Sequence, residues 1–352
     1  MALVKSINET YVIAEIGQNH NGDINIAKKL IDQIDRYTYD EHSGDRYNKC
    51  NGIKLTKRDL DEELSKEGMQ RPYTGPNSFG PTYGEHREFL ELSYEDHVEL
   101  GNYIKSKGFE FVQTLCSVKT LKLLDMVEVD QIKVASRDLT NIPLIEALAK
   151  RPEPIILSTG MADEKDLSTV IDIFNSSNKR NISILHCISQ YPAEYGNLNL
   201  NTISWLKEQL NYKIGYSDHS IGTHIPVAAV AMGAEIIEKH VTLDTSMKGT
   251  DHKGSADMNT FHKMMHDIRS LEFGLGKWGM FRDDSVTAAK EKLERSLATK
   301  VDLPVGTELK EEHLHMISPG SGLKWNDRHE VIDKMVNHNV KKNTIISDAI
   351  FY

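Results

Sequence analysis

The sequence has few cysteines and no long apolar run. Its three cysteines, Cys50, Cys116 and Cys187, lie far apart and lack the spacing of a metal site. We therefore expect reduced thiols in a cytoplasmic protein rather than a disulfide framework. No apolar run approaches the roughly 20 residues that span a bilayer. The first residues also lack the apolar core of a signal peptide, so neither a membrane partner nor export is expected.

An excess of positive charge is also absent. The 352 residues carry a formal net charge of −10, which argues against nucleic acid as a partner. Hydrophobic residues make up 39% of the chain, as in an ordinary globular protein. This length predicts one large domain with a small one, or two domains. A site for an anionic ligand would have to concentrate lysines locally.

Strand-like and helix-like segments alternate from residue 11 to residue 273. Strands are predicted at residues 11–16, 52–55, 110–114, 131–136, 154–160, 182–187, 212–216 and 234–239. Helices are predicted at residues 24–38, 93–107, 118–127, 142–150, 164–175, 202–210, 221–233 and 258–273. Eight βα units are the repeat number of a (β/α)8 TIM barrel. A doubly wound open sheet is the alternative, which is weakened because no Gly-x-Gly-x-x-Gly follows a strand.

Two connecting segments lack a clear period. Residues 39–51 are polar and are predicted to form a surface excursion without assigned chemistry. Residues 56–92 are rich in Gly, Pro and aromatic side chains. Because a loop of that length in a compact domain is usually functional, we expect a lid or a substrate wall. An ornament on the rim of the fold is the alternative.

Polar residues lie at the ends of all the predicted strands. They are Glu15, Lys54, Thr114, Lys133, Ser136, Ser158, Thr159, Ser189, Tyr191, Ser217, His219, Glu238 and His240. In a barrel these ends face one mouth. Lysines with hydroxyls suit a phosphorylated anion, and glutamates suit proton transfer or the stabilisation of a cation. The pattern predicts an active site at this mouth.

Two imidazoles end consecutive predicted strands. His219 and His240 should meet at the same edge of the sheet, since a βα unit connects parallel strands. Neutral imidazoles there could hold a divalent metal with positions open for substrate. Two buried, hydrogen-bonded histidines would give the same pattern. Glu238, two residues before His240, should point to the same face and add a carboxylate.

The chain changes character after residue 281. We predict a catalytic barrel over residues 1–281, a charged helical linker over 282–294 and a compact β-rich module over 295–352. A module of this size is marginally stable alone. It should therefore lean on a barrel, its own or a neighbour's. A purely structural cap is the alternative.

Several motifs, in order, resemble the sialic acid synthase family. They are Glu15-Ile-Gly-Gln-Asn-His-Asn-Gly22, Lys133-Val-Ala-Ser136, Leu157-Ser-Thr-Gly-Met161, Tyr216-Ser-Asp-His219 and Glu238-Lys-His-Val-Thr-Leu-Asp244. The stretch from Arg295-Ser-Leu-Ala to Pro319-Gly-Ser-Gly322 resembles the family's C-terminal SAF (antifreeze-like, β-clip) domain. The likeness runs from about residue 10 to residue 350.

The resemblance implies a transferase that forms a C–C bond. Such enzymes condense phosphoenolpyruvate with an N-acylated hexosamine, such as N-acetylmannosamine or its 6-phosphate. The products are a nonulosonic (sialic-type) acid and phosphate. The resemblance also implies a divalent metal, Mn²⁺ or Mg²⁺, and a domain-swapped homodimer in which the SAF domain covers the partner's barrel.

The resemblance further assigns roles to residues. The metal ligands fall on His219 and His240. The phosphoenolpyruvate contacts fall on Lys54, Thr114, Lys133, Ser136, Ser158 and Ser217. The catalytic groups fall on Glu15, Lys54, Lys133, Asp138 and Glu238. The sugar contacts fall on Asn77, Ser189, Tyr191 and Asp251.

Three departures from the family pattern leave the sugar open. Thr56 stands where many members carry a glutamine, Ser189 replaces a common asparagine, and Ser318 replaces an arginine before Pro-Gly-x-Gly. Legionaminic and pseudaminic acid synthases are alternatives. Arg71-Pro-Tyr and Thr82-Tyr-Gly-Glu-His86 resemble members that act on a 6-phosphate. More remote hypotheses are a metal-dependent pyruvate aldolase, and a binding module in which the SAF-like domain is the working part.

Overall fold

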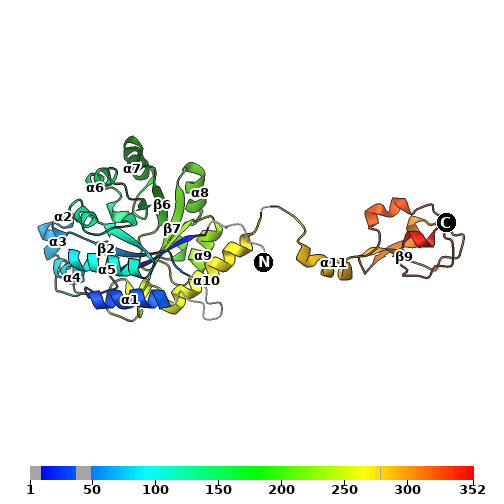
Figure 1. Ribbon diagram of the computed structural model, residues 1–352, viewed down its shortest axis with the longest axis horizontal. Helices are drawn as coiled ribbons and strands as arrows, with labels where there is room; N and C mark the ends of the chain where they lie inside the picture. Colours follow the sequence, from blue (N-terminus) through cyan, green and yellow to red (C-terminus); the bar gives the residue numbers. More distant parts are fainter. Residues whose placement is uncertain (1–8, 37–48, 278) are drawn as a thin grey trace. The chain divides into compact units, whose positions relative to one another are not determined.

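The computed structural model describes residues 9–36, 49–277 and 279–352. It divides the chain into two compact units, Met1–Gly276 and Lys277–Tyr352 (Figure 1). In the first unit eight strands, all parallel, close into a barrel in chain order. The predicted (β/α)8 fold is confirmed, whereas the predicted boundaries at residues 281 and 294 stay predictions. Of the predicted excursion at 39–51, residues 39–48 lie outside the described part.

The barrel strands are short and buried. They are β1 (Tyr11–Gly17), β2 (Gly52–Lys57), β3 (Glu110–Leu115), β4 (Gln131–Val134), β5 (Ile155–Ser158), β6 (Ile182–Cys187), β7 (Lys213–Asp218) and β8 (Ile236–His240). Outward side chains pack against the helices in one large apolar core. A small cluster of Ile13, Val112, Ile156, Leu185 and Ile236 fills the barrel interior. Burial on both faces explains why these strands are nearly continuous apolar runs.

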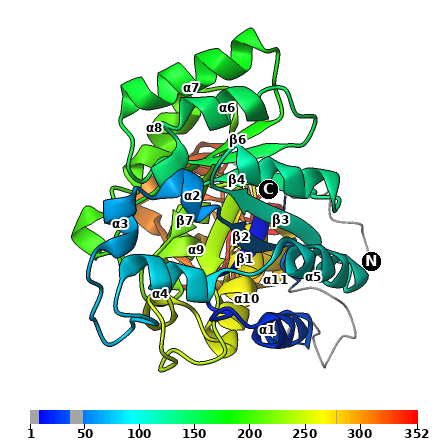
Figure 2. The same ribbon diagram turned by 90° about the vertical axis from the view of Figure 1, so that its left-hand side faces the viewer.

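A ring of helices surrounds the strands (Figures 1 and 2). They are α1 (Ile24–Arg36), α5 (Tyr94–Ser106), α6 (Ile142–Leu148), α7 (Glu164–Ser176), α8 (Asn201–Gln209), α9 (His224–Ala231) and α10 (Met258–Leu275). The helix predicted at 118–127 forms instead as a 3-10 helix, Lys119–Asp125. The Thr120 hydroxyl donates to the Ser117 carbonyl at 2.6 Å. This local bond favours the tighter turn. In the described part of the chain, no helix has the length and apolarity needed to cross a bilayer.

The segment predicted as a long loop at residues 56–92 is partly helical. It contains α2 (Leu60–Glu63), α3 (Lys66–Gln70) and α4 (Tyr83–Leu90), which lie on one side of the ring of strands in Figure 2. The expectation of a structureless loop is wrong because capping outweighs the weak apolar period. Thr82 and Glu85 form a reciprocal capping box at the start of α4.

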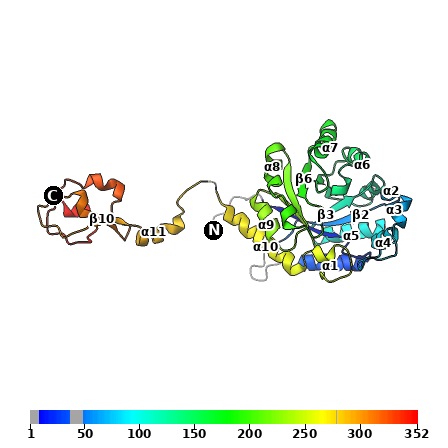
Figure 3. The same cartoon turned by 180° about the vertical axis from the view of Figure 1, so that it is seen from behind.

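The second unit has its own apolar core. After α11 (Thr287–Leu293), strand β9 (Ser296–Thr299) pairs antiparallel with β10 (Leu314–Ile317) (Figure 3). Short 3-10 helices and isolated bridges connect the remaining turns. Leu297, Leu309 and Val336 are among the side chains that are fully buried here. The predicted small β-rich module is therefore confirmed.

Candidate active site

A cavity of about 520 Å³ opens at the carboxyl ends of the barrel strands. This volume lies in the usual range for small-molecule sites. All but three of the predicted site residues line it: Glu15, Lys54, Thr114, Lys133, Ser136, Ser158, Ser189, Tyr191, Ser217, His219, Glu238, His240 and Asp251. The strand-end pattern thus brings these side chains into one basin.

A bulge at the end of β1 makes room in this basin. The pairing of β1 with β2 shifts register between Glu15 and Gly17. Gly17 adopts a φ of 54°, which favours glycine. A Cβ atom at residue 17 would lie 2.9 Å from Glu15 Oε1 and 3.1 Å from His240 Cε1. Glycine therefore lets a carboxylate and an imidazole approach one another.

Lys54 lies between two carboxylates. Its Nζ atom is 2.8 Å from Glu238 Oε2 and 3.3 Å from Glu15 Oε2, and all three side chains are almost fully buried. Register explains one of these pairs, because Glu15 and Lys54 are directly paired across β1 and β2. Burial by itself would lower the pKa of Lys54, but the two carboxylates outweigh it and raise that pKa. Lys54 is therefore a permanent cation.

The two carboxylates differ in protonation. Burial raises the pKa of Glu15 above its usual 4.5, with Lys54 only partly offsetting it. Burial also disfavours the charge of Glu238, but Lys54 and Lys133 prevail and lower its pKa. The Ser217 hydroxyl donates to Glu238 Oε1 at 2.9 Å and adds to this effect. Two neighbouring carboxylates with divergent pKa values can act as a fixed anion and as a group that exchanges protons.

Lys133 is a buried cation with neutral partners. Its Nζ atom donates to Ser158 Oγ at 2.6 Å and to the Val134 carbonyl at 2.9 Å. Burial lowers its pKa from 10.5 to about 8, so it remains charged at neutral pH. The Thr114 hydroxyl oxygen is also buried and has no hydrogen-bond partner among the described residues. A desolvated ammonium beside an unsatisfied hydroxyl is a suitable receptor for an anion.

The two predicted metal ligands face the same space. The ring centroids of His219 and His240 are 5.6 Å apart, and the Tyr191 ring packs against His219 at 4.0 Å. His219 Nδ1 donates to the Ile188 carbonyl at 2.8 Å, which leaves the lone pair on Nε2. Burial lowers the pKa of His240 to about 4, so this imidazole is neutral. Its Nδ1 atom is buried and, within residues 9–36, 49–277 and 279–352, has no hydrogen-bond partner.

These features fit a metal held by two imidazoles. The Ile188 carbonyl orients the ring of His219, as hydrogen bonds to the second ring nitrogen do for histidines that bind metals. Within the described residues, no set of three or more His, Cys, Asp or Glu side chains is placed to bind an ion. A metal on His219 and His240 would therefore keep several positions for water and substrate, as catalytic metals do.

Three predicted site residues do not line the cavity. The Thr159 hydroxyl instead donates to the Leu185 carbonyl at 3.2 Å. Asp138 is buried and pairs with Arg137 at 3.3 Å. Asn77 accepts a hydrogen bond from the Gly249 backbone at 3.4 Å, which joins the segment before α4 to the loop after β8. Their predicted roles in catalysis and sugar binding stay predictions.

The cavity also contains groups that the strand-end pattern missed. They are chiefly Gln18, Arg58, Tyr83, Arg87, Arg137 and Cys187. Arg137 directly follows the strand predicted at 131–136, so its position could have been predicted, whereas Arg58 directly follows β2 only as observed, Gly52–Lys57. Tyr83 and Arg87 come from α4, so the predicted substrate wall in 56–92 is supplied by a helix. No pattern of strand ends could have found these two.

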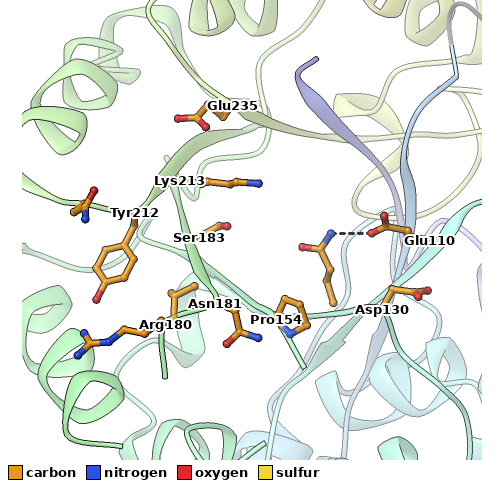
Figure 4. Close-up of a pocket in the computed structure, with 12 residues that line it drawn as sticks. Glu110, Asp130, Pro154, Arg180, Asn181, Ser183, Tyr212, Lys213 and Glu235 are labelled. Carbon is orange, nitrogen blue, oxygen red and sulfur yellow. Dashed lines mark hydrogen bonds between the residues drawn. The ribbon is translucent and has the colours of Figure 1, made fainter. Parts of the chain in front are cut away.

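A second cavity lies at the opposite end of the barrel. It holds about 780 Å³ and is lined by residues at the amino ends of the strands, including Glu110, Lys213 and Glu235 (Figure 4). Glu110 accepts hydrogen bonds from Gln131 at 2.9 Å and from the Tyr11 hydroxyl at 2.6 Å. None of the predicted site residues lines it. Active sites of such barrels lie at the other end, so we assign the chemistry to the carboxyl mouth.

Comparison with known proteins places the chain in a family. It matches the NeuB family over residues 46–279 and the SAF domain over residues 294–350. It is 36% identical over 300 residues to N-acetylneuraminate-9-phosphate synthase of Mus musculus, which covers 85% of this chain and 80% of the relative. It is 31% identical over 341 residues to N,N'-diacetyllegionaminic acid synthase of Legionella pneumophila, with 96% and 93% covered.

A solved structure agrees with this placement. The crystal structure of N-acetylneuraminic acid (sialic acid) synthetase from Leptospira borgpetersenii, in complex with citrate, superposes with a TM-score of 0.68 at 30% identity. The match covers 82% of this chain and 93% of the other. The chain is therefore an enzyme of the NeuB family, a condensing synthase with a C-terminal SAF domain.

Proposed function

We propose that this enzyme condenses phosphoenolpyruvate with the open-chain form of an N-acylated hexosamine, yielding a nonulosonic acid and inorganic phosphate. One observation carries the proposal. A single cavity holds two buried lysines, two carboxylates with divergent pKa values and two imidazoles. The names of the relatives, which are synthases of sialic-type acids, support the same class of product.

Phosphoenolpyruvate would be held by the groups that lack a counterion or a partner. In the part of the chain that the structure describes, Lys133 has only neutral hydrogen-bond partners and the Thr114 hydroxyl has none. A phosphate or carboxylate oxygen would satisfy both and would restore the lost solvation of the ammonium. Ser136, Ser158 and Ser217 line the same cavity and supply further hydroxyl groups.

The aldehyde of the sugar would meet the other side of the cavity. A divalent metal such as Mn²⁺ or Mg²⁺ on His219 and His240 would supply Lewis-acid polarisation of the carbonyl oxygen. Tyr191, which packs on His219, and Asp251 line this side. They are suited to orient the hydroxyl and acylamino groups of the sugar.

The residues account for each charge that the condensation develops. Carbon 3 of phosphoenolpyruvate attacks the aldehyde carbon, and the new alkoxide takes a proton. Positive charge then develops at carbon 2, where Glu238, held ionised by Lys54, provides electrostatic stabilisation. Water adds at carbon 2, and Glu15, with its raised pKa, is suited to accept the released proton. Phosphate leaves as the carbon 2 ketone forms, while Lys54 and Lys133 offset its charge.

The expected homodimer and cytoplasmic location belong to this proposal. The second unit, Lys277–Tyr352, is small, and a domain of this size gains stability by packing on a larger one. A second copy of the chain would supply such a surface. Size-exclusion chromatography with light scattering tests this, and a monomer at micromolar concentration would contradict it.

Phosphate release is the experiment that tests the reaction. The enzyme is incubated with phosphoenolpyruvate and a panel of N-acylated mannosamine and altrosamine derivatives, free and 6-phosphorylated, with and without a chelator. We expect one phosphate per nine-carbon product, detected by mass spectrometry, and loss of turnover on chelation. Turnover in a parallel incubation with pyruvate in place of phosphoenolpyruvate would support the aldolase alternative, and no turnover with any sugar would refute the proposal.

A further inference from the structure

Asp218 and Lys239 form a fully buried ion pair at the ends of β7 and β8. Lys239 Nζ is 2.6 Å from Asp218 Oδ2, and the two side chains are 1% and 0% exposed. Lys239 also donates a hydrogen bond to the Ser220 carbonyl, and the Ser220 backbone N–H donates to Asp218 Oδ1 at 3.0 Å. The pair and the backbone on both sides of His219 are therefore joined in one closed ring of hydrogen bonds.

Each member of this ion pair directly precedes one of the two imidazoles of the catalytic cavity. Asp218 comes before His219, and Lys239 comes before His240. Successive side chains of a strand point to opposite faces, so the imidazoles line the cavity whereas the ion pair does not. The ion pair lies instead on the outward face of the strands. It therefore ties together, from behind, the two segments that carry the imidazoles.

The strand pairing makes this ion pair the last link before the imidazoles. Asp218 and Lys239 are directly paired across β7 and β8, and the pairing of these two strands ends there. His240 is paired with Glu15 of β1, and His219 begins the loop after β7. The two imidazoles are thus not paired with each other, and their separation depends on the last link.

Two further contacts of His219 lead away from β8. Its Nδ1 atom donates to the Ile188 carbonyl at 2.8 Å, and its own carbonyl accepts a hydrogen bond from the Ala193 backbone N–H at 2.9 Å. Both partners belong to the loop after β6. These contacts fix the direction of the ring relative to β6, but they do not fix its distance from His240.

An ion pair is a costly way to fill this position. Neighbouring side chains on the same face are apolar and belong to the large core: Ile214, Tyr216, Ile237 and Val241. Removing two charges from water is so costly that apolar residues of similar volume often stabilise a fold at least as well. Stability alone therefore does not account for Asp218 and Lys239. The charges add a fixed geometry, because a short contact between an ammonium and a carboxylate tolerates little displacement.

We propose that Asp218 and Lys239 are positioning residues that fix the separation of the two imidazoles and thereby raise the affinity of the enzyme for a divalent metal ion. This inference rests on the proposed function, in which His219 and His240 hold that ion. A metal site needs its ligands within about 0.5 Å of the productive geometry. Within the described residues no third His, Cys, Asp or Glu side chain completes a metal site with them, so no other ligand corrects an error in their separation.

A second buried ion pair provides a matched control. Arg269 and Glu272 of α10 lie 3.0 Å apart and are both buried. Arg269 donates to the Thr10 carbonyl at 3.1 Å, and the Thr10 backbone N–H donates to Glu272 Oε1 at 2.6 Å. The base thus donates to a backbone carbonyl and the acid accepts from a backbone N–H, as in the first pair. Thr10 directly precedes β1, so this control pair lies at the amino ends of the strands, away from the catalytic cavity.

The test measures Mn²⁺ binding by the full-length enzyme without substrates, from the electron paramagnetic resonance signal of free Mn²⁺. In Asp218→Asn/Lys239→Met, the amide still accepts from the Ser220 N–H, and methionine has a length similar to that of lysine. Because both charges disappear together, no unpaired charge remains, and the midpoint of thermal unfolding of the metal-free protein should stay near that of the wild type. The Kd for Mn²⁺ should rise at least about tenfold. The control variant, Arg269→Met/Glu272→Gln, should keep the wild-type Kd.

Asp218→Glu is a second variant that does not require the fold to tolerate a neutral pair. It keeps both charges but displaces the carboxylate by one methylene group, so it should also raise the Kd for Mn²⁺. A wild-type Kd in the folded double variant, or in Asp218→Glu if the double variant does not fold, would overturn the inference. An equal rise in the control variant would overturn it too, since the loss of any buried ion pair would then have the same effect.

Failure of the proposed function would give a different result. A wild-type enzyme that binds no Mn²⁺, or whose Mn²⁺ binding survives His219→Ala, would remove the metal from the proposed function, and this inference with it.

Discussion

Replacing Lys133 with methionine should separate stability from activity. Methionine has a similar length but no charge, so the substitution removes a buried ammonium without opening a large cavity. Lys133 is 1% exposed, and its hydrogen-bond partners, Ser158 and the Val134 carbonyl, are neutral. We expect a folded protein that binds phosphoenolpyruvate poorly.

The stability effect follows from the pKa of Lys133. Burial lowers it from 10.5 to about 8. At about 1.4 kcal/mol per tenfold change in proton affinity, the charged form costs the fold about 3 kcal/mol. Between pH 8 and pH 10.5 the folded state has lost a proton that the unfolded state keeps, so stability rises with pH in this window. Below pH 8 the full cost is present.

Lys133→Met should therefore leave the free energy of unfolding at pH 7 unchanged or raise it by about 1 kcal/mol. The substitution removes the charge cost but also removes two hydrogen bonds, each worth about 1 kcal/mol. It should also abolish the rise in wild-type stability between pH 8 and pH 10.5. Differential scanning calorimetry of both proteins across this pH range measures these effects.

The activity effect has the opposite sign. An ammonium paired with a buried phosphate or carboxylate commonly contributes at least about 3 kcal/mol to binding. The KM of phosphoenolpyruvate should therefore rise more than a hundredfold, or turnover should be lost. Initial rates of phosphate release against phosphoenolpyruvate concentration give this value. An unchanged KM, or a folded state destabilised by more than about 2 kcal/mol, would refute the assignment of Lys133 as an anion receptor.

Three further substitutions of barrel residues, at Lys239, Glu15 and His219, test the same reasoning about burial and charge. Lys239→Met should destabilise the barrel by about 3 kcal/mol, because Lys239 is as buried as Lys133 but pairs with Asp218 at 2.6 Å and would leave that carboxylate uncompensated. Its control, Lys263→Met in an exposed pair, should stay within about 0.5 kcal/mol; equal melting temperatures would contradict the reasoning. Wild-type turnover should fall as the pH drops through the raised pKa of Glu15, and Glu15→Gln should remove that limb of the pH–rate profile; an unaltered profile would exclude Glu15 as the proton acceptor. His219→Ala should abolish turnover and retain the circular dichroism spectrum, and turnover insensitive to this change would remove the metal from the proposal.

Many features of this protein could be predicted from local patterns. The positions of the eight strands along the chain could be predicted because strands that are buried on both faces are nearly continuous apolar runs. The meeting of Glu15, Lys54, Lys133 and His240 follows because parallel strands share one carboxyl edge. This topological rule needs only the type and order of the elements. Most of the residues that line the site could therefore be predicted without knowing any interatomic distance.

The missed features depend on short-range signals or on contacts across the chain. Capping at Ser65 and Thr82 set the short helices of residues 56–92, where an apolar period was too weak to indicate them. Arg87 reaches the cavity from α4, which no rule about strand ends places there. Asp138 follows β4 as expected, yet its side chain is turned to Arg137.

The sequence by itself determined which chemical groups gather at the barrel mouth, since strand order and strand ends are local properties that topology converts into neighbours. Only the tertiary structure decided which of these groups are paired. Lys54 lies between two carboxylates, whereas Lys133 and Arg87 donate to neutral partners in the described part of the chain. Protonation and ligand charge depend on distances and burial in three dimensions, and no spacing along the chain specifies these.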